Sequence, residues 1–187
     1  MEADLLLRIH AFSCPALDTA ARIGWLLGVR GFCVPAVLVA VAWHLSREER
    51  REALAWLAVG VATALLPEIV KAAVARPRPT LWPWLIPTSG YALPSGHAVA
   101  GAALYPLLGW LVLRSLGQGR LGYHLGLAIG VFVGLSRLYA GMHWPSDVLA
   151  GWALGAALSL GAVRWLGGPL RGPRPPRGED LERPSAP

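Results

Sequence analysis

Charged side chains are scarce in this chain of 187 residues. Asp, Glu, Lys and Arg together make up 15% of the sequence, whereas 55% of it is hydrophobic. A soluble domain of this length carries roughly 25% charged residues. The shortage of charge excludes an ordinary soluble globular protein and indicates a single membrane domain.

Cysteine and lysine are nearly absent as well. The two cysteines, Cys14 and Cys33, form neither a metal-ligand pattern nor a disulfide framework. Among the Lys and Arg positions only Lys71 is a lysine, and the formal net charge is +6. These basic residues lie at the ends of apolar stretches rather than in one continuous stripe, so we exclude nucleic acid as a partner.

Apolar stretches account for most of the sequence. They cover residues 31–46, 53–70, 98–113, 121–135 and 148–163. Each is somewhat shorter than the ~20 residues that cross a bilayer core, and arginines at their ends can extend to the headgroups. We therefore expect an all-α, polytopic membrane helix bundle with five to six transmembrane helices.

The two ends of the chain differ from this central part. Residues 1–30 are amphipathic and interrupted by Pro15, which predicts an N-terminal interfacial helical segment, with a sixth partial span as the alternative. Charges from Glu2 onward break the first apolar run, so no cleavable signal peptide is expected. Residues 31–166 form the predicted transmembrane domain. Residues 167–187 are rich in Gly, Pro and Arg without an apolar period and predict a disordered cytoplasmic tail.

Three polar motifs interrupt the apolar stretches, at residues 71–79, 94–97 and 136–147. The first follows the second span, the second precedes the third span, and the third joins the last two spans. All three are therefore expected on the same side of the membrane.

The motifs carry three cations, Lys71, Arg78 and Arg137. An arginine fork binds two phosphate oxygens at once and a lysine supplies a point charge. Cations at membrane spans are costly unless they serve a purpose. Binding and stabilising a phosphoryl group is such a purpose, because its transition state spreads negative charge over several oxygens.

The second motif leads directly into a predicted helix. A helix N-terminus presents free N–H groups to an anion, and the glycine at Gly96 lets a phosphate come close to the backbone. Ser95 either caps the helix or binds the phosphate. A simple helix cap leaves His97 unexplained.

The third motif pairs His143 with Asp147. A carboxylate bonded to one ring nitrogen fixes the tautomer, so that the other nitrogen can attack. The alternative is an interfacial histidine beside a helix-capping aspartate. Glu68, one turn before Lys71, is either a further functional acid or an ion-pair partner of a cation in the site.

Together the motifs resemble the signature of the type 2 phosphatidic acid phosphatase superfamily, which includes membrane lipid phosphate phosphatases of bacteria and shares its site with vanadium haloperoxidases. That signature reads Lys, six residues, Arg-Pro; then Pro-Ser-Gly-His; then Ser-Arg, five residues, His, three residues, Asp. It is matched at every defined position over about residues 50–165. The resemblance implies that His143 is the nucleophile, that Asp147 orients it and that His97 is the acid. It also implies no metal and no cofactor. The phosphate ligands would be Lys71, Arg78, Ser95, Gly96 and Arg137.

The resemblance makes residues 31–166 a phosphatase domain. It predicts an integral membrane lipid phosphatase that acts through a phosphohistidine on undecaprenyl diphosphate, phosphatidylglycerol phosphate or phosphatidic acid. The alternatives are a phosphotransferase with an acceptor other than water, a vanadate-dependent haloperoxidase and a transporter without enzymatic activity.

Arginines and glycines predict the orientation and packing. Ten arginines belong to the side opposite the motifs, against seven basic residues on the motif side, three of which the motifs themselves use. By the positive-inside rule the site faces the periplasm or the exterior of the plasma membrane. Small-residue stripes at Gly126, Gly130 and Gly134 and at Gly151 and Gly155 are expected to pack the last two spans together, with a homodimer as the alternative.

Overall fold

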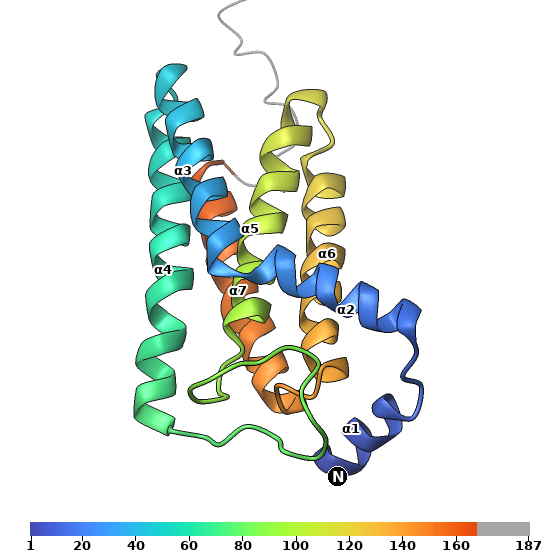
Figure 1. The fold of residues 1–187 in the computed structure, drawn as a ribbon. Helices are drawn as coiled ribbons and strands as arrows, with labels where there is room; N and C mark the ends of the chain where they lie inside the picture. Colours follow the sequence, from blue (N-terminus) through green and yellow to red (C-terminus); the bar gives the residue numbers. More distant parts are fainter. Residues whose placement is uncertain (168–187) are drawn as a thin grey trace, which may run out of the picture.

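The protein is a bundle of helices in a computed structural model that describes residues 1–167 (Figure 1). The helices are α1 (Glu2–His10), α2 (Pro15–Gly28), α3 (Arg30–Ser46), α4 (Arg50–Val74), α5 (Gly96–Leu113), the short 3₁₀ helix η1 (Arg114–Leu116), α6 (Gly119–Tyr139) and α7 (Pro145–Trp165). Within residues 1–167 there is no β-strand. The predicted all-α bundle is confirmed, and the predicted tail lies almost wholly outside the described residues.

The described chain has four helices that are long and apolar enough to cross a membrane, namely α4, α5 continued by η1, α6 and α7. A fifth span exists only if α2 and α3 are counted together, with a bend of 46° between them. The predicted span at 31–46 is therefore too short alone, because α3 has 17 residues and begins after a break at the extended Val29. The described residues therefore contain at most five candidate spans, and the sixth span of the prediction goes beyond this number.

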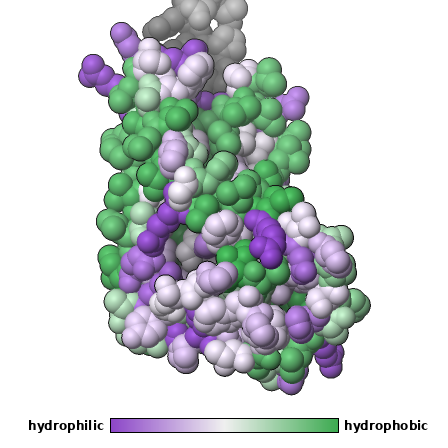
Figure 2. Space-filling model, in the orientation of Figure 1, coloured by the Kyte–Doolittle hydropathy of each residue, from purple (hydrophilic) through white to green (hydrophobic). Residues whose placement is uncertain are grey.

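The sides of the bundle are apolar. Leu38, Val39, Ile69 and Leu149 each expose more than half of their surface. Figure 2 shows mostly hydrophobic surface over the upper part of the bundle and hydrophilic residues gathered among the lower loops. Large exposed apolar patches on four long helices suit lipid rather than water. The protein is thus a multi-pass membrane protein.

Helix α5 is the centre of the bundle and packs against α4, α6 and α7. Glycines permit the closest of these approaches. A Cβ at Gly126 would lie 2.1 Å from the carbonyl oxygen of Tyr105, and one at Gly155 would lie 2.4 Å from that of Val99. The glycine stripes of α6 and α7 therefore face α5.

This arrangement corrects the expectation that the stripes join the last two spans to each other. The α6 stripe meets α7 only through Trp152, whose indole a Cβ at Gly134 would overlap and whose Nε1 donates to the Gly130 carbonyl over 3.1 Å. Because α5 is almost wholly apolar and lies between them, α6 and α7 each bury their small residues against it. The homodimer alternative stays a prediction.

The loops that carry the three motifs meet at one end of the bundle. There α4 and α6 end, α5 and α7 begin, and the segment 75–95 crosses between them, at the lower end of Figure 1. The backbone N–H of Ser95 donates to the carbonyl of Asp147 over 3.0 Å and so joins the second motif to the third. The expectation of one common side is confirmed.

The N-terminal segment consists of two helices separated before Pro15, as the sequence predicts. Helix α2 crosses over α5 and α6, and α1 lies at the motif end (Figure 1). Leu6 of α1 is fully buried, in a cluster with Leu138 and Val148. Helix α1 is therefore packed onto the loop end of the bundle.

Candidate active site

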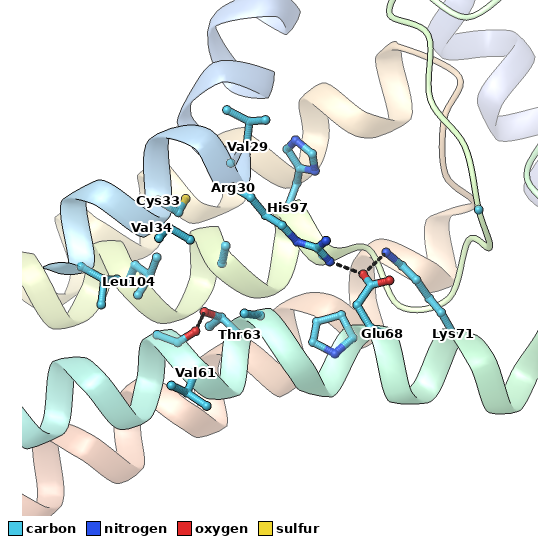
Figure 3. Close-up of a pocket in the computed structure, with 18 of the residues that line it drawn as sticks. Val29, Arg30, Cys33, Val34, Val61, Thr63, Glu68, Lys71, His97 and Leu104 are labelled. Carbon is cyan, nitrogen blue, oxygen red and sulfur yellow. Dashed lines mark hydrogen bonds and ion pairs between the residues drawn. The ribbon is translucent and has the colours of Figure 1, made fainter.

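A cavity of about 560 Å³ opens between α3, α4, α5 and the motif loops. One part is lined by predicted site residues, namely Lys71, Arg78, Gly96, His97 and His143. The other part is lined by apolar side chains, among them Val34, Leu38, Leu57 and Val61. In Figure 3, Glu68, Lys71 and His97 lie toward one end and Val34, Val61 and Leu104 toward the other. The cavity thus joins a polar end to an apolar groove.

Lys71 lies in the last turn of α4, which ends where Ala75 adopts a left-handed conformation. Its ammonium donates to Glu68 over 2.9 Å, and Glu68 also accepts from Arg30 of α3 (Figure 3). Glu68 is thus an ion-pair partner of Lys71, one of the two roles the sequence left open. A Cβ at Gly96 would lie 3.8 Å from the Lys71 ammonium, so glycine there leaves room beside the cation.

Arg78 comes from the loop after α4 and joins the first motif to the third. Its guanidinium donates to the carbonyls of Ser89, Gly90 and Met142. Nη1 also donates to His143 Nε2 over 3.0 Å. Burial lowers the pKa of Arg78, although the nearby carboxylates of Asp147 and Glu68 oppose that shift. The guanidinium is thereby fixed directly beside the imidazole.

Ser95 and His97 flank the start of α5 in different ways. Ser95 is fully buried and its hydroxyl accepts from the Ala98 N–H over 3.5 Å, so it acts as the helix cap and does not line the cavity. His97 lines the cavity and its buried Nε2 has no hydrogen-bond partner among residues 1–167. The His97 ring packs against α2, where a Cβ at Gly28 would lie 2.6 Å from its Cδ2.

His143 and Asp147 are both buried at the start of α7. His143 Nδ1 lies 3.6 Å from Asp147 Oδ2, just beyond hydrogen-bond distance. Oδ2 accepts from the Trp144 N–H over 2.8 Å, so Asp147 also caps α7. Asp147 is therefore a helix cap that also flanks the histidine, and its role in fixing the imidazole tautomer stays a prediction.

The charge of His143 follows from its surroundings. Burial lowers the pKa of His143 to about 4; Asp147 raises it, and the Arg78 guanidinium lowers it further. An imidazole with such a pKa is neutral at pH 7. Its unprotonated nitrogen can accept the hydrogen bond from Arg78 and is available for attack on an electrophile.

Protein groups surround the Arg137 guanidinium. It is fully buried on α6 and lies outside the cavity wall. Its guanidinium donates to the Ala21 carbonyl, the Ser136 hydroxyl and the Met142 sulfur. Met142 lines the cavity, so Arg137 supports the third motif through this contact. A direct phosphate contact by Arg137 stays a prediction.

Arg76 is the site neighbour that the sequence interpretation missed. It stands within the first motif at a position the signature leaves undefined, and it was counted among the topology charges. Its Nη1 donates to Asp147 Oδ1 over 2.7 Å. A third cation so close in sequence to Lys71 and Arg78 was the available signal, but spacing does not say which arginine reaches the carboxylate.

Within residues 1–167, no group of three or more His, Cys, Asp or Glu side chains is placed to hold a metal ion. Metal independence stays a prediction.

The fold and the cavity define a multi-pass membrane helix bundle with a cationic, histidine-containing cavity at one end. Residues 52–169 match the family model described as the PAP2 superfamily, and the chain belongs to that family. The resemblance seen in the three motifs is confirmed.

Individual relatives fit this assignment. The chain is 31% identical to phosphatidylglycerophosphatase B of Bacillus subtilis over 71% of its own length and 66% of that protein. It is 39% identical to an undecaprenyl-diphosphatase of Sulfolobus acidocaldarius, over 40% of its own length and 33% of that protein. The chain therefore spans only part of both relatives.

A solved structure gives the same result for the fold. A transmembrane PAP2-type phosphatidylglycerolphosphate phosphatase from Bacillus subtilis superposes with a TM-score of 0.78 at 27% identity, covering 86% of this chain and 82% of that one. The similarity thus extends beyond the motifs to the arrangement of the helices.

Proposed function

We propose that this protein is an integral membrane phosphatase that hydrolyses lipid phosphates or diphosphates through a phosphohistidine on His143. One observation carries the proposal. His143 Nε2 contacts the Arg78 guanidinium, while Nδ1 faces Asp147, in a cavity that continues into an apolar groove. The proposed nucleophile, the cation beside it and an apolar groove that could hold a lipid chain therefore belong to one cavity.

In the first step the substrate phosphate enters between Lys71, Arg78 and the N-terminus of α5. Arg78 shifts its donor from His143 to a phosphate oxygen, which frees Nε2. Nε2 then forms a bond to phosphorus while the bond from phosphorus to the leaving oxygen breaks. His97 gives a proton to that oxygen, and Asp147 stabilises the positive charge that develops on the His143 ring.

In the second step water attacks the phosphohistidine. His97 accepts a proton from the water, the P–N bond breaks, and inorganic phosphate leaves with His143 restored. Lys71 and Arg78 stabilise the equatorial oxygens in both steps. The groups proposed to stabilise charge all belong to the protein, and the proposed steps include no metal and no cofactor.

The substrate is proposed to be a lipid because the apolar end of the cavity lies between α3 and α4, along the membrane-facing part of the bundle. Each buried methylene contributes ~0.8 kcal/mol, so even a short length of acyl or prenyl chain favours a lipid strongly. The names of the relatives support phosphatidylglycerol phosphate and undecaprenyl diphosphate as candidates, with phosphatidic acid as a third.

The cavity is proposed to open to the periplasm or exterior. Arginines at the opposite end support this orientation by the positive-inside rule. Those in the described part of the chain are Arg47, Arg50, Arg51, Arg114, Arg120 and Arg164.

The test is phosphate release by the purified, detergent-solubilised protein. The three lipids and glycerol phosphate are compared by kcat/KM, with His143→Ala as the control for contaminating phosphatases. We expect a lipid to exceed glycerol phosphate by orders of magnitude. Equal values for glycerol phosphate and the best lipid would reject the lipid assignment, and unchanged turnover by His143→Ala would reject the mechanism.

A further inference from the structure

Asp147 is held by a cation that the proposed mechanism does not use. Arg76 Nη1 donates to Asp147 Oδ1 over 2.7 Å, and the Trp144 N–H donates to Oδ2 over 2.8 Å. Each carboxylate oxygen therefore has a fixed donor, and the direction in which Oδ2 faces His143 Nδ1 is set by these two bonds.

Arg76 is in turn held by Glu2 of helix α1. Nη2 of Arg76 donates to Glu2 Oε2 over 2.7 Å. The other oxygen of Glu2 accepts from both the backbone N–H and the hydroxyl of Ser146, over 2.9 and 2.8 Å. Arg76 Nη1 also donates to the Ser146 hydroxyl over 2.6 Å, and its guanidinium lies over the Trp144 ring. These bonds tie α1, the first motif and the start of α7 into one network.

The network supplies a positive charge beside the buried carboxylate of Asp147. Asp147 is fully buried, and a buried carboxylate is costly without a nearby cation. His143 is neutral at pH 7 because burial lowers its pKa, so it does not compensate the charge. Arg76 is the cation that lies in contact with Asp147. Partial burial opposes ionisation of Glu2, but the hydrogen bonds from Ser146 and Arg76 outweigh it and lower the pKa of Glu2, which keeps it anionic.

We propose that Arg76 and Glu2 are positioning residues for the reaction, acting on His143 through Asp147, and that α1 is thereby a part of the active site. The inference rests on the proposed function of His143. Arg76 holds the carboxylate in the orientation that fixes the imidazole, and Glu2 holds Arg76. Neither residue touches the substrate.

The opposite end of the bundle supplies a matched control. Arg114 donates to Glu52 over 2.9 Å and lies over the Trp110 ring at 5.1 Å, compared with 5.6 Å for Arg76 over Trp144. This pair has the same chemistry and lies far from the site in the bundle; its arginine is about as exposed as Arg76, and Glu52 is more buried than Glu2. Removing it tests what loss of an ion pair does to the membrane-embedded fold alone.

The experiment compares Arg76→Gln, Arg76→Lys and Glu2→Gln with Arg114→Gln and Glu52→Gln, in full-length protein with the purification tag at the C-terminus. We measure kcat and KM for the best lipid, and thermal unfolding in the same detergent. Arg76→Gln is expected to lower kcat about 10- to 100-fold, the scale seen when the partner of an orienting group is lost. KM should stay within about twofold, because binding groups are untouched.

Three further results are expected. Arg76→Lys restores part of kcat, since a lysine keeps the charge without the fork. Glu2→Gln lowers kcat by a smaller factor than Arg76→Gln. The double variant Glu2→Gln with Arg76→Gln loses no more than Arg76→Gln alone, because Glu2 acts through Arg76. The two control variants keep the kcat of the parent.

The inference is overturned if Arg76→Gln keeps the kcat of Arg114→Gln, or if its loss of kcat matches a loss of folded protein. If Arg76→Gln does not fold, Glu2→Gln decides: unchanged kcat rejects the inference, and reduced kcat with unchanged unfolding temperature supports it. His143→Ala separates this from the proposed function. An active His143→Ala rejects the phosphohistidine mechanism, whereas an inactive one with a fully active Arg76→Gln rejects only the positioning role.

Discussion

Arg78 and His143 come from loops 65 positions apart in sequence, yet Nη1 of the arginine donates directly to Nε2 of the histidine over 3.0 Å. The contact places a permanent cation on the nitrogen that would attack phosphorus. A phosphate bound to Arg78 would therefore lie next to the nucleophile without any movement of the backbone.

The two histidines should respond differently to substitution. His143→Ala is expected to abolish turnover while the protein stays folded, because no other group can form the covalent intermediate. His97→Ala should lower kcat by about 10²- to 10⁴-fold for a lipid phosphate, the usual contribution of a general acid. With a p-nitrophenyl leaving group the loss in kcat/KM, which reports the first step and not the later attack of water, should shrink, since that group departs without a proton. An equal loss on both kinds of substrate would contradict the assignment of His97 as the acid.

The protonation of His143 predicts a pH dependence. Burial lowers the pKa of His143 to about 4, so the ring is neutral above that pH and becomes protonated as the pH falls through it. A protonated ring cannot attack. Titration of ¹⁵N-labelled histidine by NMR should therefore show His143 changing near pH 4 rather than near the ordinary value of about 6.5. Arg78→Gln removes a cation that lowers the pKa and should move the midpoint upward. A midpoint near 6.5 in the parent protein would contradict the prediction.

Chelation and vanadate test the source of charge stabilisation. Because the proposed stabilising groups are side chains and backbone amides, EDTA should leave activity unchanged. Vanadate should inhibit competitively, since it adopts the five-coordinate geometry of the transition state. Activity that is lost in EDTA and restored by magnesium or zinc would show that a metal takes part.

Gly126 tests the packing of α6 on α5. A Cβ at this position would lie 2.1 Å from the Tyr105 carbonyl oxygen, so Gly126→Ala forces the two backbones apart. Overpacking of this kind costs about 1–3 kcal/mol. Gly161→Ala is the matched control, because a Cβ at Gly161 of α7 meets nothing within 4 Å. We expect a lower unfolding temperature in detergent for the first variant and no decrease for the second. Equal unfolding temperatures would contradict the close contact.

Sidedness can be measured with single cysteines in a variant lacking Cys14 and Cys33. Tyr91→Cys lies in the loop at the site end and Leu116→Cys lies at the opposite end, and both native side chains are well exposed. An impermeant thiol reagent added to intact cells should label the first and not the second. The reverse pattern would place the site on the cytoplasmic side.

The sequence alone was sufficient for the helical class, the membrane location and the three motifs. Hydropathy reports burial in lipid over each stretch of about 20 residues, and order and spacing of the motifs place them on one side. That order puts Lys71, Gly96 and His143 at the same end of the bundle, where they line the cavity. These properties depend on the local sequence and on the fact that successive spans cross the membrane in opposite directions. They can therefore be predicted without knowing how the helices pack.

Tertiary structure decided which polar groups meet. It buried Arg137 outside the cavity lining and placed Arg76, 71 positions from Asp147, on the carboxylate. It also turned the glycine stripes toward α5 and bent the chain by 46° between α2 and α3. The chain contains many arginines, and their side chains are long and alike in charge. The path of a loop and the packing of α1 and α7 around it decide which arginine reaches the buried carboxylate. The spacing of residues along the chain predicts neither.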